Sequence, residues 1–218
     1  MVYWLVSWLI MPFLRRRVRR VLGREHIPEN EPLVIVANHN SWIDPALIIS
    51  TLYPVVKRKI WFIAASKKYR ALGGLPIDWA NKGRVIDDAT AILQEGGVIG
   101  IFPEGNANGT GELHHGRTGA ARLALRTGAA VLPIGVRNTT GTNPLAAMYT
   151  ACTAKSIALE IGSPLLYPKT LPEEITYARL QDVTADILNH LAILSGKHNN
   201  HGLSNPSSDS LSPDSPTL

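Results

Sequence analysis

Cysteine is almost absent from this chain, since Cys152 is the single cysteine among 218 residues. One thiol excludes a disulfide framework and a zinc site built from cysteines. Cys152 has small residues on both sides, so we expect it to pack in the interior. The HExxH pattern of zinc proteases and the GxSxG pattern of many serine hydrolases are missing too.

Long apolar runs are also lacking. The amino-terminal run ends after 14 residues at Leu14, whereas a membrane-spanning helix needs about 20. Positive charges follow this run instead of preceding it, which is the reverse of a secretory signal. We expect residues 1–24 to be an amphipathic, apolar membrane-attachment arm with Tyr3, Trp4 and Trp8 at headgroup depth. The alternative is a terminal helix packed on the core.

Acidic residues are missing from this arm, which instead carries six arginines. They account for the net charge of +5, because basic and acidic residues are equal in number over 25–195. We therefore expect the arginines to bind an anionic lipid surface on the cytoplasmic face of a membrane. A basic surface for nucleic acid is not expected. The arginines are Arg15, Arg16, Arg17, Arg19, Arg20 and Arg24.

A second group of basic residues lies between Asp44 and Asp78, in a span without acids. It either meets phosphates of a headgroup or coenzyme, or forms an ordinary solvated face. Its members are Lys57, Arg58, Lys59, Lys67, Lys68 and Arg70.

Short apolar runs rich in β-branched residues alternate with helical patterns along residues 25–195. Such alternation predicts an α/β fold with a mainly parallel, mixed sheet flanked by helices. We treat 25–195 as one domain, and 196–218 as a disordered tail because it is rich in Ser, Asn, Pro and Asp. The expected strands are 33–38, 61–66, 98–102, 129–136 and 155–162, and the expected helices are 45–52, 83–95, 117–128 and 172–194.

Two candidate catalytic residues follow expected strands directly. His39 comes after the strand 33–38, and Glu104 comes shortly after the strand 98–102. Active-site residues gather at the carboxyl ends of parallel strands. We therefore expect His39 and Glu104 to meet in one crevice.

Asp44 follows His39 by five residues, and Pro45 suits the first turn of a helix. In that arrangement Asp44 both caps the helix and binds one ring nitrogen of His39, which leaves the other nitrogen as a general base. Ser41 is close, but no nucleophile elbow surrounds it. The nucleophile is therefore expected to be the hydroxyl of a second substrate, attacking without a covalent enzyme intermediate.

Two other interpretations of these residues are open. His39, Asp44 and Glu104 could form a metal site together with His114 and His115, although no usual ligand spacing is present. His39 could also be merely hydrogen-bonded at a strand end, with Asp44 as a helix cap.

Four blocks in this chain resemble the glycerophospholipid acyltransferase family, whose best-known members are lysophosphatidic acid acyltransferases. The resemblance runs from about residue 33 to 137. The family's His-x4-Asp motif is matched by His39 and Asp44, its Phe-Pro-Glu-Gly motif by 102–105, its basic-x-Gly-Ala-Ala pattern by 117–121, and its apolar Pro-Ile-Gly segment by 132–135.

The resemblance implies that 25–195 is an acyltransferase domain, in which His39 is the base, Asp44 orients it, and Glu104 and Gly105 bind the acceptor. Two family arginines that grip the acceptor phosphate are replaced by Trp79 and Ala107. We expect Arg84, Asn106 and Arg117 to serve the acceptor instead.

The sequence thus predicts an O-acyltransferase of phospholipid biosynthesis that acylates the free hydroxyl of lysophosphatidic acid. Its co-substrate is acyl-CoA or acyl carrier protein, the latter also a possible protein partner, and no metal or other cofactor is expected. The alternatives are acyl transfer to another lyso-lipid or lipid alcohol, a non-catalytic lipid-binding relative, and a metal-dependent hydrolase.

Overall fold

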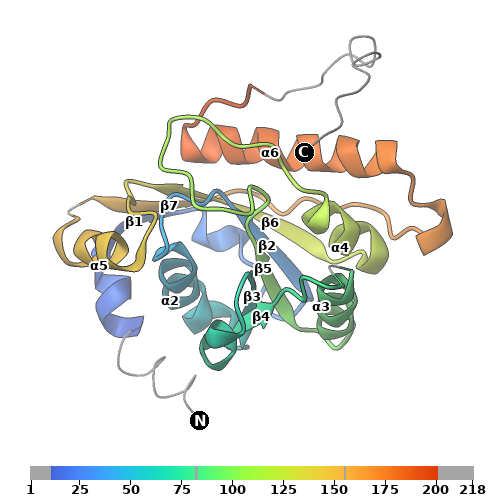
Figure 1. The fold of residues 1–218 in the computed structure, drawn as a ribbon, viewed down its shortest axis with the longest axis horizontal. Helices are drawn as coiled ribbons and strands as arrows, with labels where there is room; N and C mark the ends of the chain where they lie inside the picture. Colours follow the sequence, from blue (N-terminus) through green and yellow to red (C-terminus); the bar gives the residue numbers. More distant parts are fainter. Residues whose placement is uncertain (1–10, 82, 155, 201–218) are drawn as a thin grey trace, which may run out of the picture.

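The computed structural model describes residues 11–81, 83–154 and 156–200 (Figure 1). At the centre of this part of the chain lies a seven-stranded sheet with the strand order β1-β7-β6-β2-β5-β3-β4. Its strands are β1 (Val18–Leu22), β2 (Leu33–Ala37), β3 (Ile60–Ala64), β4 (Gly74–Pro76), β5 (Val98–Ile101), β6 (Ala130–Arg137) and β7 (Ile157–Ile161).

The strands of this sheet run parallel to their neighbours except at one junction. The pairs β2–β5, β2–β6, β3–β5, β3–β4 and β1–β7 are parallel, and β6–β7 is antiparallel. The predicted mainly parallel, mixed sheet flanked by helices is therefore confirmed.

Strand β2 lies at the middle of the sheet and shows how the two layers form. All five of its residues are buried, and successive side chains of a strand point to opposite faces. Val34 and Val36 pack with residues of α3 (Arg84–Gln94), α4 (Gly119–Thr127) and α6 (Tyr177–Ser195). Leu33, Ile35 and Ala37 pack with α2 (Asp44–Val56). Figure 1 shows α6 and α2 on opposite sides of the sheet.

The expected central strands and helices are present, with ends that differ by a few residues. The expected helix 172–194 begins later, because Pro172–Glu174 forms the short 3-10 helix η3 and α6 starts at Tyr177. Five elements were not predicted from the sequence: β1, β4, the 3-10 helices η1 (Arg24–His26) and η2 (Lys67–Leu72), and α5 (Pro144–Thr153). Cys152 lies on α5 and is exposed, so the expectation that it packs in the interior is wrong.

The amino-terminal arm differs from the expectation in its second half. Residues 11–17 are helical, but Val18–Leu22 forms β1, which pairs with β7 at the edge of the sheet. The range 1–24 is therefore not one attachment helix, because its end belongs to the fold. Residues 1–10, which include Tyr3, Trp4 and Trp8, lie outside the described residues. Within those described, no helix combines the length and the apolar character needed to cross a bilayer.

The first residues of the expected disordered tail are part of the fold. Residues 196–200 are described and pair with the loop that follows β5: the main-chain nitrogen of Leu113 donates to the oxygen of His198, and that of His198 donates to Gly111, each at 2.9 Å. Residues 201–218 lie outside the described part of the chain.

Candidate active site

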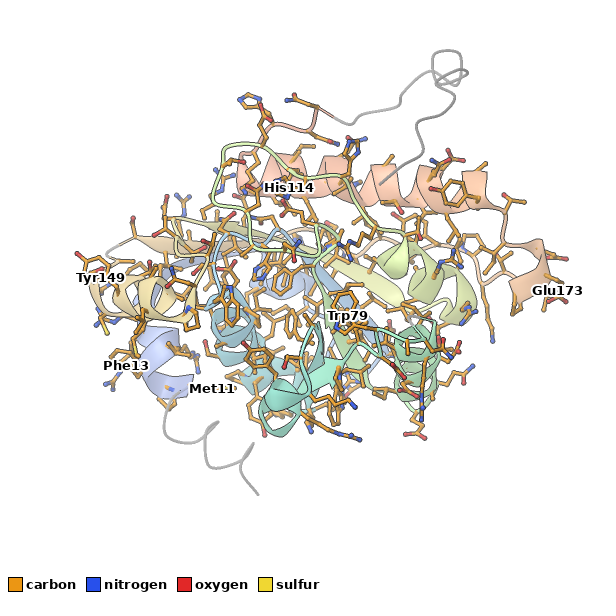
Figure 2. All side chains as sticks on the ribbon, viewed as in Figure 1. Met11, Phe13, Trp79, His114, Tyr149 and Glu173 are labelled. Carbon is orange, nitrogen blue, oxygen red and sulfur yellow. The ribbon has the colours of Figure 1, made fainter. Side chains whose placement is uncertain are left out.

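Two segments that carry the candidate residues meet at one edge of the sheet. Strands β2 and β5 are parallel neighbours, with Val36 opposite Ile101. His39 follows β2 by two residues, and Phe102 follows β5 directly. Trp79 follows β4, and His114 lies on the loop after β5; both residues are labelled in Figure 2. The predicted convergence at the carboxyl ends of the strands is therefore present.

The side chains of His39 and Asp44 are joined by a hydrogen bond. Nδ1 of His39 lies 3.1 Å from Oδ2 of Asp44. The Asp44 side chain is fully buried, and that of His39 is 14% exposed. Within the described residues, Nε2 of His39 has no hydrogen-bond partner. An imidazole that donates from Nδ1 to a carboxylate keeps Nε2 as the basic nitrogen.

Asp44 does not cap helix α2 as the sequence analysis predicted. The N-cap residue is Ile43, and Asp44 is the first residue of the helix. Its Oδ2 reaches back to accept hydrogen bonds of 2.7 Å from the main-chain nitrogens of Asn40 and Ser41. The carboxylate therefore shapes the loop that presents His39, because the loop turns around it. Oδ1 of Asp44 is buried and has no hydrogen-bond donor among the described residues.

Glu104 is buried and is bonded to the protein through both of its oxygens. Oε1 accepts a 2.8 Å hydrogen bond from the main-chain nitrogen of His39. Oε2 accepts bonds from Nδ2 of Asn108 at 3.1 Å and from the main-chain nitrogen of His114 at 3.0 Å. Glu104 thus ties the β2–α2 loop to the loop after β5, and the predicted contact with acceptor hydroxyls stays a prediction.

Aromatic stacking fixes the plane of the His39 ring. Its centroid lies 4.0 Å from that of Phe102, and the two planes differ by 14°. Phe102 in turn stacks on Phe62, a residue of β3, at 5.2 Å. The hydrogen bond to Asp44 thus fixes the edge of the imidazole, and the stack on Phe102 fixes its face.

Ser41 is placed away from any catalytic role. It is fully buried, and its hydroxyl donates to the main-chain oxygens of Thr140 at 2.6 Å and Gly141 at 3.0 Å. A hydroxyl bound to two carbonyls does not present its oxygen to a substrate. The arrangement agrees with a nucleophile that comes from a second substrate.

Arg117 and Gly105 lie side by side. Gly105 has a positive φ of 79°, and a Cβ built on it would lie 2.8 Å from Nε of Arg117. The main-chain nitrogen of Arg117 donates to the oxygen of Pro103 at 2.9 Å. Arg117 and Asn106 are exposed beside the Glu104 turn. The structure thus brings three of the predicted acceptor residues together.

Arg84 is less closely placed. It is exposed at the amino end of α3, a helix that packs against α4. The described residues contain no hydrogen bond or ion pair between its side chain and the rest of the site. Trp79, which replaces a family arginine, is 57% exposed and donates from Nε1 to the oxygen of Ala65 at 3.1 Å.

The basic group between residues 57 and 70 is at least partly structural. The guanidinium of Arg58 donates to the main-chain oxygens of Glu29, Glu31 and Gly96. Nζ of Lys59 lies 3.2 Å from the centre of the Trp61 ring, a cation–π contact. These two residues hold the fold, so the alternative of a phosphate site is left to Lys57 and to the η2 members of the group.

A cavity of about 1020 Å³ lies against Glu104. It is lined by residues 110–117 and by His198. Its wall includes Arg117, His114 and His115, so it offers one permanent cation and further groups that can become positive. Among the described residues, no group of three His, Cys, Asp or Glu side chains is arranged to hold a metal ion. The absence of a metal requirement stays a prediction.

Sequence reasoning missed several residues that build the site. Asn38 and Asn40 bind the main chain of Val136 and so hold the His39 loop to β6. Asn108 binds Glu104, and Nζ of Lys197 donates to the oxygen of Asn108 at 2.7 Å. The two asparagines flanking His39 were a usable signal, because buried amides at a strand end commonly serve the main chain. No local pattern marks Lys197.

The fold and this site define a family. The model of the family described as Acyltransferase matches residues 18–137, just over half of the chain. The chain belongs to this family. The match ends at Arg137, so α5, β7, α6 and Lys197 lie outside it.

Curated relatives and a solved structure agree with this assignment. A 1-acyl-sn-glycerol-3-phosphate acyltransferase of Borreliella burgdorferi is 30% identical over 127 residues, which is 55% of this chain and 51% of the relative. The human 1-acyl-sn-glycerol-3-phosphate acyltransferase alpha is 29% identical over 123 residues, 52% of this chain and 44% of the relative. The chain thus spans about half the length of these relatives.

The fold is also that of a solved acyltransferase. The crystal structure of the 1-acyl-sn-glycerophosphate (LPA) acyltransferase PlsC from Thermotoga maritima aligns with a TM-score of 0.56 and 20% sequence identity. The alignment covers 88% of this chain and 81% of PlsC. At this identity the likeness concerns the fold alone.

Proposed function

We propose that this protein is an O-acyltransferase of phospholipid biosynthesis that moves a fatty acyl group from a thioester to the free hydroxyl of lysophosphatidic acid. The observation that carries the proposal is the 3.1 Å bond between Nδ1 of His39 and Oδ2 of Asp44, which leaves Nε2 as a base beside the sheet edge. The names of the relatives support the acceptor.

The chemistry follows from this geometry in two proton movements. Nε2 of His39 takes the proton of the acceptor hydroxyl as its oxygen attacks the thioester carbonyl. The carbon–sulfur bond breaks, and the imidazolium returns the proton to the leaving thiolate. Asp44 holds the ring in one tautomer and stabilises the imidazolium. No acyl-enzyme forms, because Ser41 is bound to carbonyls.

The acceptor phosphate is assigned to the cavity beside Glu104. Its volume of about 1020 Å³ is ample for a glycerophosphate headgroup. Arg117 lines it and has no ion-pair partner among the described residues, so its guanidinium can take a phosphate. Gly105, Asn106 and Arg84 are proposed to line the acceptor path. The donor is acyl-CoA or acyl carrier protein, and the reaction uses no metal or other cofactor.

Attachment to an anionic membrane surface on its cytoplasmic face is proposed for the amino-terminal arm together with α5. On the helical segment 11–17, Leu14 is buried and Phe13 is 45% exposed, with the guanidinium of Arg17 over its ring. Leu14 packs in one cluster with Ala151 of α5. Phe13 and Tyr149 lie at the same side of the molecule in Figure 2.

Helix α5 presents an apolar face beside this segment. Leu145, Met148 and Tyr149 are 79%, 62% and 70% exposed and share one helix face by their spacing. Apolar side chains next to exposed arginines are typical of a surface that lies in a membrane interface. The main-chain oxygens of Thr140 and Gly141, just before α5, bind Ser41, so this face is directly connected to the His39 loop.

A second acceptor class is favoured by one observation. Trp79 is exposed at a position where the family carries an arginine, and Ala107 occupies the other such position. The indole N–H of Trp79 already donates to the oxygen of Ala65, and the methyl group of Ala107 has no hydrogen-bond donor. Transfer to an uncharged lipid alcohol is therefore the second candidate.

One assay separates these candidates. The purified full-length chain is given labelled acyl-CoA or acyl carrier protein with lysophosphatidic acid, lysophosphatidylcholine or monoacylglycerol, and the lipid products are separated. We expect phosphatidic acid as the main product. Preferred acylation of monoacylglycerol establishes the second candidate, and no product with any acceptor contradicts the proposed function.

A further inference from the structure

The chain returns to the active site after its last helix. Gly196 ends α6 with a positive φ of 70°, and Lys197 and His198 follow it. Nζ of Lys197 donates to the oxygen of Asn108 at 2.7 Å. The main-chain bonds of His198 to Gly111 and Leu113 fasten this segment to the loop after β5. Lys197 is thereby held at the loop that carries Glu104.

Asn108 links Lys197 to both His39 and Glu104 through hydrogen bonds. It is buried, its main-chain nitrogen donates to the oxygen of His39, and its Nδ2 donates to Oε2 of Glu104. A side chain that holds the Asn108 carbonyl therefore acts on the position of both His39 and Glu104.

The two carboxylates of the site lack a close cationic partner. Asp44 is fully buried and Glu104 is 4% exposed. Neither forms an ion pair with a lysine or arginine in the described part of the chain, and Oδ1 of Asp44 accepts no hydrogen bond there. Two buried negative charges near one another are costly unless a positive charge compensates them.

Lys197 supplies positive charge at this place. Burial lowers the pKa of its ammonium group, while the charges of Glu104 and then Asp44 act in the opposite direction. Both carboxylates are thus within electrostatic reach of Nζ. Because the net effect is a lowered pKa, burial of the Lys197 ammonium group disfavours its charged form. Perturbed pKa values of this kind cluster at functional sites.

We propose that Lys197 is a positioning residue of the active site: its hydrogen bond fixes Asn108, which holds His39 and Glu104 in place, and its positive charge compensates the buried carboxylates of Glu104 and Asp44. The inference rests on the proposed acyl transfer. It assigns a role to a residue outside the 18–137 span that matches the family.

The other charged groups near this cluster are more exposed or already paired. Arg137 of β6 pairs with Glu160 at 3.0 Å. The remaining neighbours are exposed on the loop after β5 and on the terminal segment: Glu112, His114, His115, Arg117 and His198. Among these groups of the described residues, Lys197 is therefore the partly buried cation that has no ion pair with a carboxylate elsewhere.

Three substitutions separate charge from hydrogen bonding. Lys197→Met removes both, Lys197→Gln keeps a donor for Asn108 without the charge, and Lys197→Arg keeps both. The matched control is Lys169→Met. Lys169 is exposed beside Gly128, which lies just before the start of β6, whereas the His39 loop is bonded to Val136 near the end of β6.

The measurement is the pH dependence of kcat/KM for the full-length chain. Without the positive charge, the Glu104–His39–Asp44 cluster takes up a proton more readily. We therefore expect the acid limb to move to higher pH by about one unit in Lys197→Met and Lys197→Gln, with about a ten-fold loss of kcat/KM on that limb. Lys197→Arg and Lys169→Met keep the wild-type profile.

Several outcomes overturn the inference. If the acid limb of the pH profile does not move in Lys197→Met, Lys197 does not act through its charge: uniformly reduced activity then shows a structural role, and unchanged activity shows no role. A wild-type profile in Lys197→Gln shows that the charge is not used. If Lys197→Met melts below the assay temperature, Lys197→Gln against Lys197→Arg decides. A wild-type chain without acyl transfer contradicts the proposed function instead, and the inference is then tested by whether the His39 ring titrates at higher pH in Lys197→Gln, followed by NMR.

Discussion

The main-chain nitrogen of His39 donates a 2.8 Å hydrogen bond to Oε1 of Glu104, which lies 65 residues further along the chain. This bond joins the two motifs that the sequence places at the ends of different strands. It makes Glu104 part of the support of the catalytic loop, since Oε2 is also occupied by Asn108 and by the main chain of His114. A carboxylate that accepts three hydrogen bonds from the protein stabilises the loops that carry the donors.

Glu104→Gln tests this support. An amide can place only one acceptor oxygen where the carboxylate has two, so at least one N–H loses its partner. We expect the free energy of unfolding to fall by about 1–3 kcal/mol, and kcat to fall about ten-fold or more because His39 is displaced. Urea denaturation and steady-state kinetics measure the two effects.

Glu173→Gln is the control, since Glu173 is exposed on η3 and does not line the cavity beside Glu104. A Glu104→Gln protein of wild-type stability, with a raised KM for the acceptor and normal kcat, contradicts the supporting role. It favours direct binding of the acceptor hydroxyls, as the resemblance to the family implies.

Arg117 is expected to bind the acceptor phosphate. Arg117→Ala should raise KM for lysophosphatidic acid about ten-fold, because a charge-assisted bond to phosphate is lost. Arg117→Lys should recover part of this loss, and Arg84→Ala should have a smaller effect since Arg84 does not line the cavity beside Glu104. Acylation of monoacylglycerol should not change.

Arg122→Ala is the matched control, because Arg122 lies on α4, the helix that begins two residues after Arg117, and its Nε donates to the hydroxyl of Thr118 at 3.3 Å. If Arg117→Ala impairs charged and uncharged acceptors equally, Arg117 shapes the turn at Gly105 and does not read the phosphate.

The apolar face of α5 is expected to bind the bilayer. Replacing Leu145, Met148 and Tyr149 together by serine should reduce binding to vesicles containing phosphatidylglycerol about ten-fold or more, because each apolar side chain contributes on burial. Flotation of the full-length chain measures the bound fraction. Binding should also weaken as salt is raised, since the arginines contribute.

The control replaces Leu166, Leu171 and Ile193 by serine, which are also exposed but belong to α6 and the segment leading to it. An equal loss of vesicle binding in both triple variants shows that any exposed apolar side chains contribute, and contradicts a specific role of α5 in membrane binding. A change in oligomeric state without a change in flotation assigns this face to a second copy of the chain.

The central fold could be predicted because its strands are marked locally. The run 33–37 is apolar throughout, as expected of a strand with helices on both faces, and the His39 and Phe102 segments follow such runs directly. Parallel neighbours then place their carboxyl ends together. The pairing of His39 with Asp44 could be inferred because the two residues are only five positions apart, on either side of the turn that leads from β2 into α2.

Elements whose partners are distant in sequence could not be predicted. Strand β1 pairs with β7, more than a hundred residues away, and its residues Arg19 and Arg20 are exposed. These arginines made the segment resemble a lipid-binding one. Helix α5 exposes its large apolar side chains, so its sequence lacks the usual alternation between a buried apolar face and an exposed polar face. Lys197 meets Asn108 across 89 residues, a contact that only the fold creates.

The most direct test of the account is the activity of His39→Gln. Glutamine can still donate to Asp44 but cannot take a proton, so the variant isolates the base. Transfer of a labelled acyl chain from the thioester to lysophosphatidic acid is measured for the full-length chain, with His190→Gln of α6 as control. The account predicts a loss of about 10²-fold or more with an unchanged melting temperature. Turnover by His39→Gln within ten-fold of wild type contradicts it.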